Sequence, residues 1–214
     1  EYSYIQRAID NATAGNTIFL SSGEYNENVI LDKPLTLIGA GSDSTIISGV
    51  ISGLGSPPLF DSSLTGIEIT ADNVEVSDLQ VSDFFKGIRI SEADGVLLSN
   101  IKIIDVTSQG VDISQSQNVE IVGLHIESSG LSGVYVGDVS SNFEMSDTVV
   151  INSQSNGIEI SSENAYIHNV TVLNNDYNGC YVHPDGTGTT ISGSTINDNG
   201  IHGIRLQAVT SATI

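Results

Sequence analysis

In many short stretches of this chain, apolar and polar residues alternate one by one, and one stretch recurs at a nearly constant spacing. Each copy is a glycine, an apolar residue, a residue of any kind and a second apolar residue. The copies lie at residues 66–69, 87–90, 110–113, 133–136, 157–160, 179–182 and 203–206, so they begin 21 to 24 residues apart. Alternation with a period of two is typical of a β-strand with one buried and one solvated face. The chain is therefore expected to be a β-strand repeat protein.

Two positions in each repeat are occupied only by Asn, Asp or Gly. The first is held by Asn73, Gly95, Asn118, Asn142, Asn164 and Gly188, and the second by Asp78, Asn100, Gly123, Asp147, Asn169 and Gly193. These residue types tolerate a positive φ, so each position marks a tight bend. Short strands joined by bends predict a coil in which each strand pairs in parallel with its equivalent one turn later, about 4.8 Å away. The expected fold class is all-β, a single-stranded parallel β-helix with three short strands per turn.

The N-terminal segment follows a helical pattern instead. Apolar residues within 4–14, among them Ile5 and Ile9, share one helical face, and Gly15 stands where a helix would end. We expect this capping α-helix to cover the first coil, because the uncovered end of a β-helix exposes unpaired backbone that invites aggregation.

The stretch between the cap and the regular repeats predicts less regular turns. Strands are expected at residues 17–20, 28–31, 35–38 and 45–48, and the Gly- and Pro-containing stretch 51–63 is expected to be a loop. The chain is thus expected to form one β-helix domain, 1–214, with a cap at 1–15, irregular turns and a loop at 16–65, and regular turns at 66–214. Because the last turn is incomplete, we expect further chain or another subunit to cover that end.

The front of the chain resembles proteins of the pectin lyase-like superfamily. The resemblance lies in residues 4–49, YIQRAIDNATAGNTIFLSSGEYNENVILDKPLTLIGAGSDSTIISG, and the later repeats extend it to the end of the chain. The most similar members are the NosD-like group and secreted, archaeal and bacterial surface β-helix proteins. The resemblance implies a right-handed parallel β-helix. It implies no single activity, because the superfamily includes lyases, esterases, epimerases, hydrolases, adhesins and phage spikes.

Charge and composition restrict the partners. Six basic and 26 acidic residues give a formal net charge of −20, which would repel a phosphate backbone, so nucleic acid is excluded as a partner. No apolar run approaches the roughly 20 residues that span a bilayer, so membrane insertion is not expected. The single cysteine, Cys180, takes an inward position of the repeat and is expected to be a core residue rather than a nucleophile.

The outward residues of the glycine-led strand form one column. From the first coil to the last, they are Glu68, Arg89, Asp112, Tyr135, Glu159, Tyr181 and Arg205. Aromatic faces stack on sugar rings and charged groups bind sugar hydroxyls, so Tyr135, Glu159, Tyr181, Arg205, Arg89 and Asp112 are candidate residues for binding a polysaccharide. The alternative is that these pairs only stabilise the sheet, by roughly 0.2 to 1 kcal/mol each.

His183 stands two residues after Tyr181 and two before Asp185, which could supply a base and an acid to move the C5 proton of a uronate. The run that follows, TTISGSTINDNGIHGI, resembles the segment after the Asp-Pro-His motif of alginate C5-epimerases, and this implies a catalytic role for His183. The order here is reversed, His-Pro-Asp, and Tyr181 stands where that family has an aspartate. The candidate catalytic residues are His183, Tyr181, Asp185 and Arg205, with Glu159 alongside; a solvated loop histidine is the alternative.

Metal sites receive less support. Glu120 and Glu144 are expected about 5 Å apart on successive turns, where they could share a Ca²⁺ ion. The four histidines are expected on different faces of the coil, so no metal site is assigned. A further polar column is expected to form hydrogen-bonded ladders at the turns; it contains Asp83, Asp105, Ser128, Asn152, Asn174 and Asp198.

These patterns leave three functional hypotheses. The preferred one is an extracellular or cell-surface β-helix module that binds polysaccharide or acts as an adhesin-like spacer. The second is a polysaccharide lyase or uronate C5-epimerase with its site around Tyr181 and His183. The third is a subunit of a surface assembly.

Overall fold

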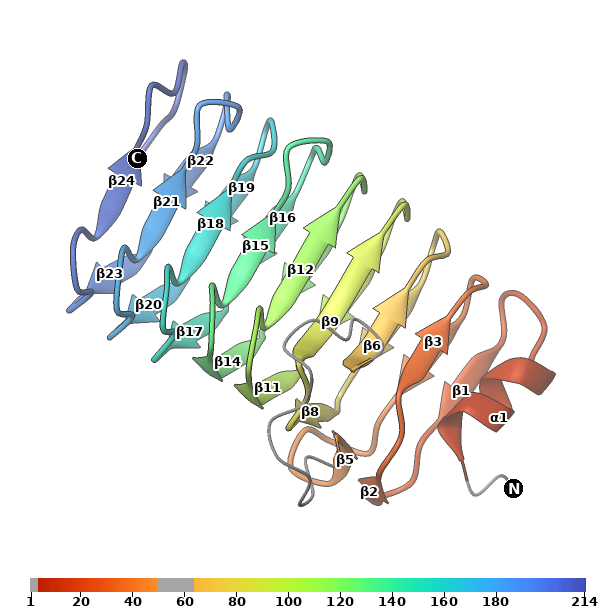
Figure 1. Cartoon of the computed structure of the whole chain (residues 1–214). Helices are drawn as coiled ribbons and strands as arrows, with labels where there is room; N and C mark the ends of the chain where they lie inside the picture. The colour runs from red at the N-terminus through yellow and green to blue at the C-terminus, as the bar shows by residue number, and fades with distance from the viewer. Residues whose placement is uncertain (1–3, 50–63) are drawn as a thin grey trace.

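A computed structural model describes residues 4–49 and 64–214, which wind into a parallel β-helix (Figure 1). The strands line up in three eight-stranded sheets, and each coil adds one strand to each sheet. This confirms the predicted all-β fold with three short strands per turn. The predicted loop at 51–63 lies outside the described residues.

The strands of each sheet are short and follow one another at one-coil intervals. The first sheet contains β1 (Thr17–Phe19), β4 (Thr36–Ile38), β7 (Glu75–Ser77), β10 (Leu97–Ser99), β13 (Glu120–Val122), β16 (Glu144–Ser146), β19 (Tyr166–His168) and β22 (Thr190–Ser192). The second contains β2 (Gly23–Tyr25), β5 (Thr45–Ser48), β8 (Gln80–Ser82), β11 (Lys102–Val106), β14 (His125–Ser129), β17 (Val149–Ile151), β20 (Thr171–Leu173) and β23 (Thr195–Asn197). The third contains β3 (Val29–Leu31), β6 (Thr65–Ile69), β9 (Lys86–Ser91), β12 (Val111–Ser114), β15 (Val134–Val136), β18 (Ile158–Ile160), β21 (Cys180–Val182) and β24 (Ile204–Leu206).

The cap is a helix, α1 (Ile5–Asn11), that is shorter than the predicted 4–14. Ile5 and Ile9 bury their side chains against the first coil, and the backbone N–H of Ile5 donates to Glu27 Oε1 at 2.8 Å. The helix ends early because Ala12 is already extended. The chain then returns to the stack, where the Gly15 N–H donates to the carbonyl oxygen of Pro34 at 2.7 Å.

Left-handed residues make the bends. At all twelve predicted bend positions φ lies between 51° and 74°. The third polar column also consists of bends, because φ lies between 53° and 62° from Asp83 to Asp198. The hydrogen bonds expected at these turns come from the backbone: the Asp83 N–H donates to the carbonyl oxygen of Ile104 at 3.4 Å, and the Asn152 N–H donates to that of Leu173 at 3.3 Å. Even Ser128 is left-handed, with a φ of 60°.

Six of the seven repeat glycines, those of the third-sheet strands from β6 to β21, are required by close packing between coils. A Cβ at Gly110 would lie 2.6 Å from the carbonyl oxygen of Gly133 and 2.7 Å from Cγ2 of Ile126. Neither neighbour can move without disturbing the stack, since one is backbone and the other is core. The inward residues that follow these six glycines are fully buried, and at Cys180 burial raises the pKa of the thiol to about 12. Cys180 is thus a protonated core residue.

Replacing Gly110 with Ala should destabilise the protein, because the added methyl group would overpack the contact between coils. Overpacking of this kind costs about 1–3 kcal/mol, measured as the free energy of unfolding in urea. Gly193→Asn is the control: Gly193 has a φ of 57°, a Cβ there would come no closer than 3.9 Å to its neighbours, and Asp or Asn already holds four of the equivalent bends. We expect it to change stability by less than about 0.5 kcal/mol. Equal losses in both variants would contradict the packing explanation.

Candidate functional site

The predicted outward column of the third sheet is present and in register. Arg89 pairs with Glu68 on one side and Asp112 on the other, and Tyr135 pairs with Asp112 and Glu159. Tyr181 then pairs with Glu159 and Arg205. The sheet that carries them runs along one face of the stack from β3 to β24 (Figure 1). The seven side chains therefore form a strip, one per coil.

The N-terminal half of this column neutralises itself. Arg89 Nη1 lies 3.3 Å from Glu68 Oε1. Asp112, only 7% exposed, is paired with Lys86. The two charged groups predicted to bind substrate here, Arg89 and Asp112, therefore already have partners within the protein.

The C-terminal half is organised around Glu159. Its Oε2 accepts hydrogen bonds from Ser132 Oγ at 2.7 Å and from Asn156 Nδ2 at 3.1 Å. Its Oε1 lies 2.8 Å from Nε2 of His183. Burial by itself would raise the pKa of Glu159, but the hydrogen bonds from Ser132, His183 and Asn156 and the charge of His183 outweigh it, so the pKa is lowered. Glu159 is ionised at neutral pH.

This contact orients the His183 ring. An ionised carboxylate only accepts hydrogen bonds, so Nε2 of His183 carries the proton of this contact, and in the neutral form of the ring Nδ1 is the acceptor. The ring packs against Tyr181, with 4.1 Å between ring centroids and 41° between planes. His183 is thus held by a carboxylate on one side and an aromatic ring on the other.

Arg205 covers Tyr181 from the next coil. Its guanidinium carbon lies 4.7 Å from the centre of the Tyr181 ring, and the Tyr181 hydroxyl donates to Gln207 Oε1. Arg205 is exposed and forms no ion pair within the parts of the chain that are described. Its fork of donors is therefore free for a ligand.

Asp185 is placed differently from the other candidate residues. It lies in the turn after β21, where the Gly186 N–H donates to the His183 carbonyl oxygen at 3.0 Å. Its side chain is exposed, and among residues 4–49 and 64–214 it forms no hydrogen bond or ion pair. The carboxylate that contacts His183 is Glu159, 24 residues earlier.

Tyr135 lies between two carboxylates of the column. The pKa of its hydroxyl is raised, mainly by burial and further by the negative charges of Glu159, Asp138 and Asp112. A hydrogen bond with Ser161 lowers the pKa but does not outweigh these effects. The hydroxyl stays protonated at neutral pH and can serve as a donor.

The other expected sites were also located. Glu120 and Glu144 are paired in register on the first sheet, and His168 Nε2 lies 3.4 Å from Glu144 Oε1. The described residues contain no group of three or more His, Cys, Asp or Glu side chains that could hold a metal ion. They also contain no helix with the length and apolar character needed to cross a membrane.

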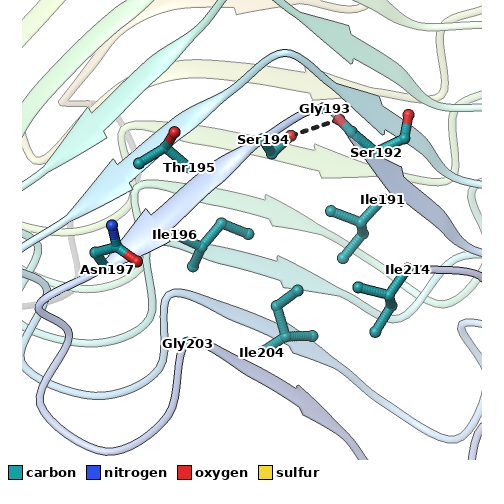
Figure 2. A pocket seen from close by; sticks show the side chains of 10 residues that line it. All are labelled: Ile191, Ser192, Gly193, Ser194, Thr195, Ile196, Asn197, Gly203, Ile204 and Ile214. Carbon is teal, nitrogen blue, oxygen red and sulfur yellow. Dashed lines mark hydrogen bonds between the residues drawn. The ribbon is translucent and has the colours of Figure 1, made fainter.

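Two hollows occur at the ends of the stack. One of about 560 Å³ lies at the last coils, where Figure 2 shows the apolar side chains Ile191, Ile196, Ile204 and Ile214 around it. Another, of about 380 Å³, lies beside the cap helix and includes Ala12 and Ile18. The column itself is an open strip along the sheet.

Comparison with known proteins agrees with this fold. A family model described as the right-handed β-helix region matches residues 21–147 and 109–214. No curated protein sequence matches the chain.

Several solved structures share the fold. The A-module of mannuronan C-5 epimerase AlgE4 from Azotobacter vinelandii has a TM-score of 0.73 and 17% identity, over 97% of this chain and 70% of that one. A pectin methylesterase in complex with a hexasaccharide has a TM-score of 0.69 and 15% identity, over 94% and 76%. The enzymatically active domain of tailspike protein 2 of bacteriophage CBA120 has a TM-score of 0.65 and 14% identity, over 97% and 40%.

The lowered pKa of Glu159 makes a prediction about stability. Glu159→Gln removes the charge that accepts three hydrogen bonds, and should cost about 1–3 kcal/mol of unfolding free energy at pH 7. The folded pKa lies below the ordinary 4.5, so the unfolded chain binds more protons below about pH 4.5. Wild-type stability should therefore fall as the pH drops through that window, and the difference from the variant should shrink.

Urea unfolding from pH 7 to pH 3 measures this difference. Glu163→Gln is the matched control, because Glu163 is exposed and lies on the same coil. If both variants lose the same stability at pH 7, the hydrogen bonds to Glu159 do not stabilise the fold.

Proposed function

Because the chain belongs to the family of right-handed β-helix proteins, we propose that it is a polysaccharide-binding module whose glycan lies along the outward column of the third sheet. The observation that carries this proposal is the group at its C-terminal half: an exposed guanidinium stacked 4.7 Å over Tyr181, beside His183 and an ionised Glu159. Aromatic faces bind sugar rings, and the charged groups around them bind hydroxyls or carboxylates.

The repeat of the fold supports a polymeric ligand. One outward side chain is presented per coil, at a spacing of about 4.8 Å, and a polysaccharide likewise repeats a chemical unit along a line. Tyr135 and Tyr181 lie two coils apart in the same outward column, with Glu159 between them. Successive sugars could therefore meet successive coils without any change in the protein.

Similar structures support the same class of ligand. By their names, one acts on mannuronan, another acts on pectin and was solved with a hexasaccharide, and a third is a phage tailspike. At 14–17% identity their likeness concerns the fold, so the glycan of this chain is inferred from its own column. A location outside the cell or on its surface belongs to the same proposal, as does a role as a rigid spacer or surface subunit.

Loss of either stacked group should weaken glycan binding. A glycan array followed by calorimetry with its best ligand is the test. Tyr181→Ala and Arg205→Gln should each raise the dissociation constant roughly tenfold, since one aromatic or cation–π contact contributes about 1 kcal/mol or more. Tyr4→Ala and Arg7→Gln are matched controls on the exposed cap and should leave binding unchanged. Absence of any bound glycan would contradict the proposal.

A second function, polysaccharide lyase or uronate C5-epimerase, is favoured by the 2.8 Å contact between His183 Nε2 and Glu159 Oε1. A carboxylate that fixes the tautomer of a histidine leaves Nδ1 as a general base. Nδ1 would take the C5 proton of a uronate, while Arg205 would pair with the uronate carboxylate. A lyase would then expel the 4-linked oxygen, with the Tyr181 hydroxyl as proton donor, and an epimerase would return a proton to the opposite face.

Incubation with a panel of polyuronates distinguishes the two functions. Ultraviolet absorbance reports the unsaturated product of a lyase, and NMR reports inversion at C5. If the protein is only a binding module, no product forms while binding persists. Turnover that is lost in His183→Ala would establish the enzyme instead.

In that case Glu159→Gln should reduce turnover, whereas Asp185→Asn, which removes an exposed carboxylate from the same turn region, should not. A larger loss in Asp185→Asn would assign the acid partner of His183 to Asp185.

A further inference from the structure

The Tyr, His and Glu arrangement of the third sheet occurs a second time on the first sheet. Tyr166 and His168 lie on β19, and Glu144 lies one coil earlier on β16, in register with Tyr166. In the same way, Glu159 is in register with Tyr181. His168 Nε2 lies 3.4 Å from Glu144 Oε1, and its ring centroid lies 4.8 Å from that of Tyr166, with 33° between planes. The two arrangements lie on different walls of the stack.

The second arrangement presents more surface to solvent. Tyr166 is 43% exposed and forms an aromatic platform on the outer face of its sheet. The carboxylate of Glu144 is also exposed beside it. An exposed ring next to hydrogen-bond acceptors is the chemistry that holds a sugar by its apolar face and its polar groups.

The charges around the two arrangements differ. Tyr181 is covered by Arg205, whereas none of the eight strands of the first sheet contains Lys or Arg. Glu120 is in register with Glu144, which places two exposed carboxylates on successive strands. Like charges that are directly opposite on neighbouring strands repel each other. A cation would remove this repulsion.

A sugar ammonium group fits this position better than a metal ion. Ca²⁺ takes six to eight oxygen ligands, and within the described residues no group of three or more His, Cys, Asp or Glu side chains could hold a metal ion. An ammonium group needs only a few acceptors, and it is attracted to both carboxylates and aromatic faces. The neighbouring ring of Tyr166 can hold the sugar that carries it.

We propose that Tyr166, His168, Glu144 and Glu120 form a second sugar-binding platform, specific for an amino sugar with a free ammonium group. Its residues lie on a sheet other than the one that carries the proposed function, so it does not depend on that function. With a ligand on each wall, one module would hold two different glycan strands at once.

Calorimetry of the full chain with a glucosamine trisaccharide, at a pH where its amines are charged, tests the platform. Tyr166→Ala and Glu120→Gln should each weaken binding roughly tenfold, and Tyr166→Phe should retain it because the ring remains. The N-acetylated trisaccharide should bind at least tenfold more weakly, since it lacks the charge. Glu75→Gln is the matched control: it removes the same charge from the same outward column, two coils from Glu120, and should leave binding unchanged.

Several outcomes would overturn the proposal. If Glu75→Gln weakens binding as much as Glu120→Gln, the attraction is general to the acidic surface. If the N-acetylated sugar binds equally well, the ammonium group is not recognised. In another outcome, the wild-type protein binds Ca²⁺ but not the trisaccharide, and Tyr166→Ala binds Ca²⁺ as tightly as the wild type does. The carboxylates would then form a metal site. If Tyr181→Ala abolishes trisaccharide binding, the ligand lies on the third sheet, which would leave the proposed function standing.

Discussion

The structure depends on one constraint, the in-register parallel pairing of each strand with its equivalent one coil later. Each pairing places a side chain directly over the one about two dozen residues before it, as Tyr181 lies over Glu159. Successive coils must therefore have the same backbone course, and left-handed residues at equivalent positions produce the same bends in each coil. The glycines of the third-sheet strands from β6 to β21 follow from the same constraint, since the next coil passes too closely for a Cβ.

Stacked asparagine side chains connect neighbouring coils to the candidate site through hydrogen bonds. Asn156 donates to Glu159 through Nδ2 at 3.1 Å, and its Oδ1 accepts from Nδ2 of Asn178 at 2.8 Å. Asn178 Oδ1 in turn lies 2.9 Å from Nδ1 of His202. Because amides in such a ladder have one donor side and one acceptor side, each member orients the next. The direction in which Asn156 presents its donor to Glu159 is therefore set from within the stack.

The features that recur once per repeat could be predicted from the sequence. The fold class, twelve of the bends and the membership of the outward column all follow from residue types at a fixed period. The sequence predicts Asp185 as a partner of His183 because it is near in sequence, but the turn at residues 184–185 leaves its side chain exposed to solvent. The contacts of Ser132 and Asn156 with Glu159 depend on side-chain conformation beside the strand, which periodicity does not encode. Ser128 takes a positive φ, which serine seldom does, because its place in the coil is a bend that Asp or Asn holds in the other coils.

A β-helix separates its fold from its chemistry unusually completely. The inward residues and the bends fix the coil, while the outward columns on different walls are free to differ, since no strand pairing joins one wall to another. This is how chains only 14–17% identical to this one can share its coil. It also explains how one chain can repeat the Tyr, His and Glu arrangement on two walls and give each a different charge, with Arg205 beside Tyr181 and Glu120 beside Glu144. Each wall therefore carries its own chemistry, which its own outward column determines.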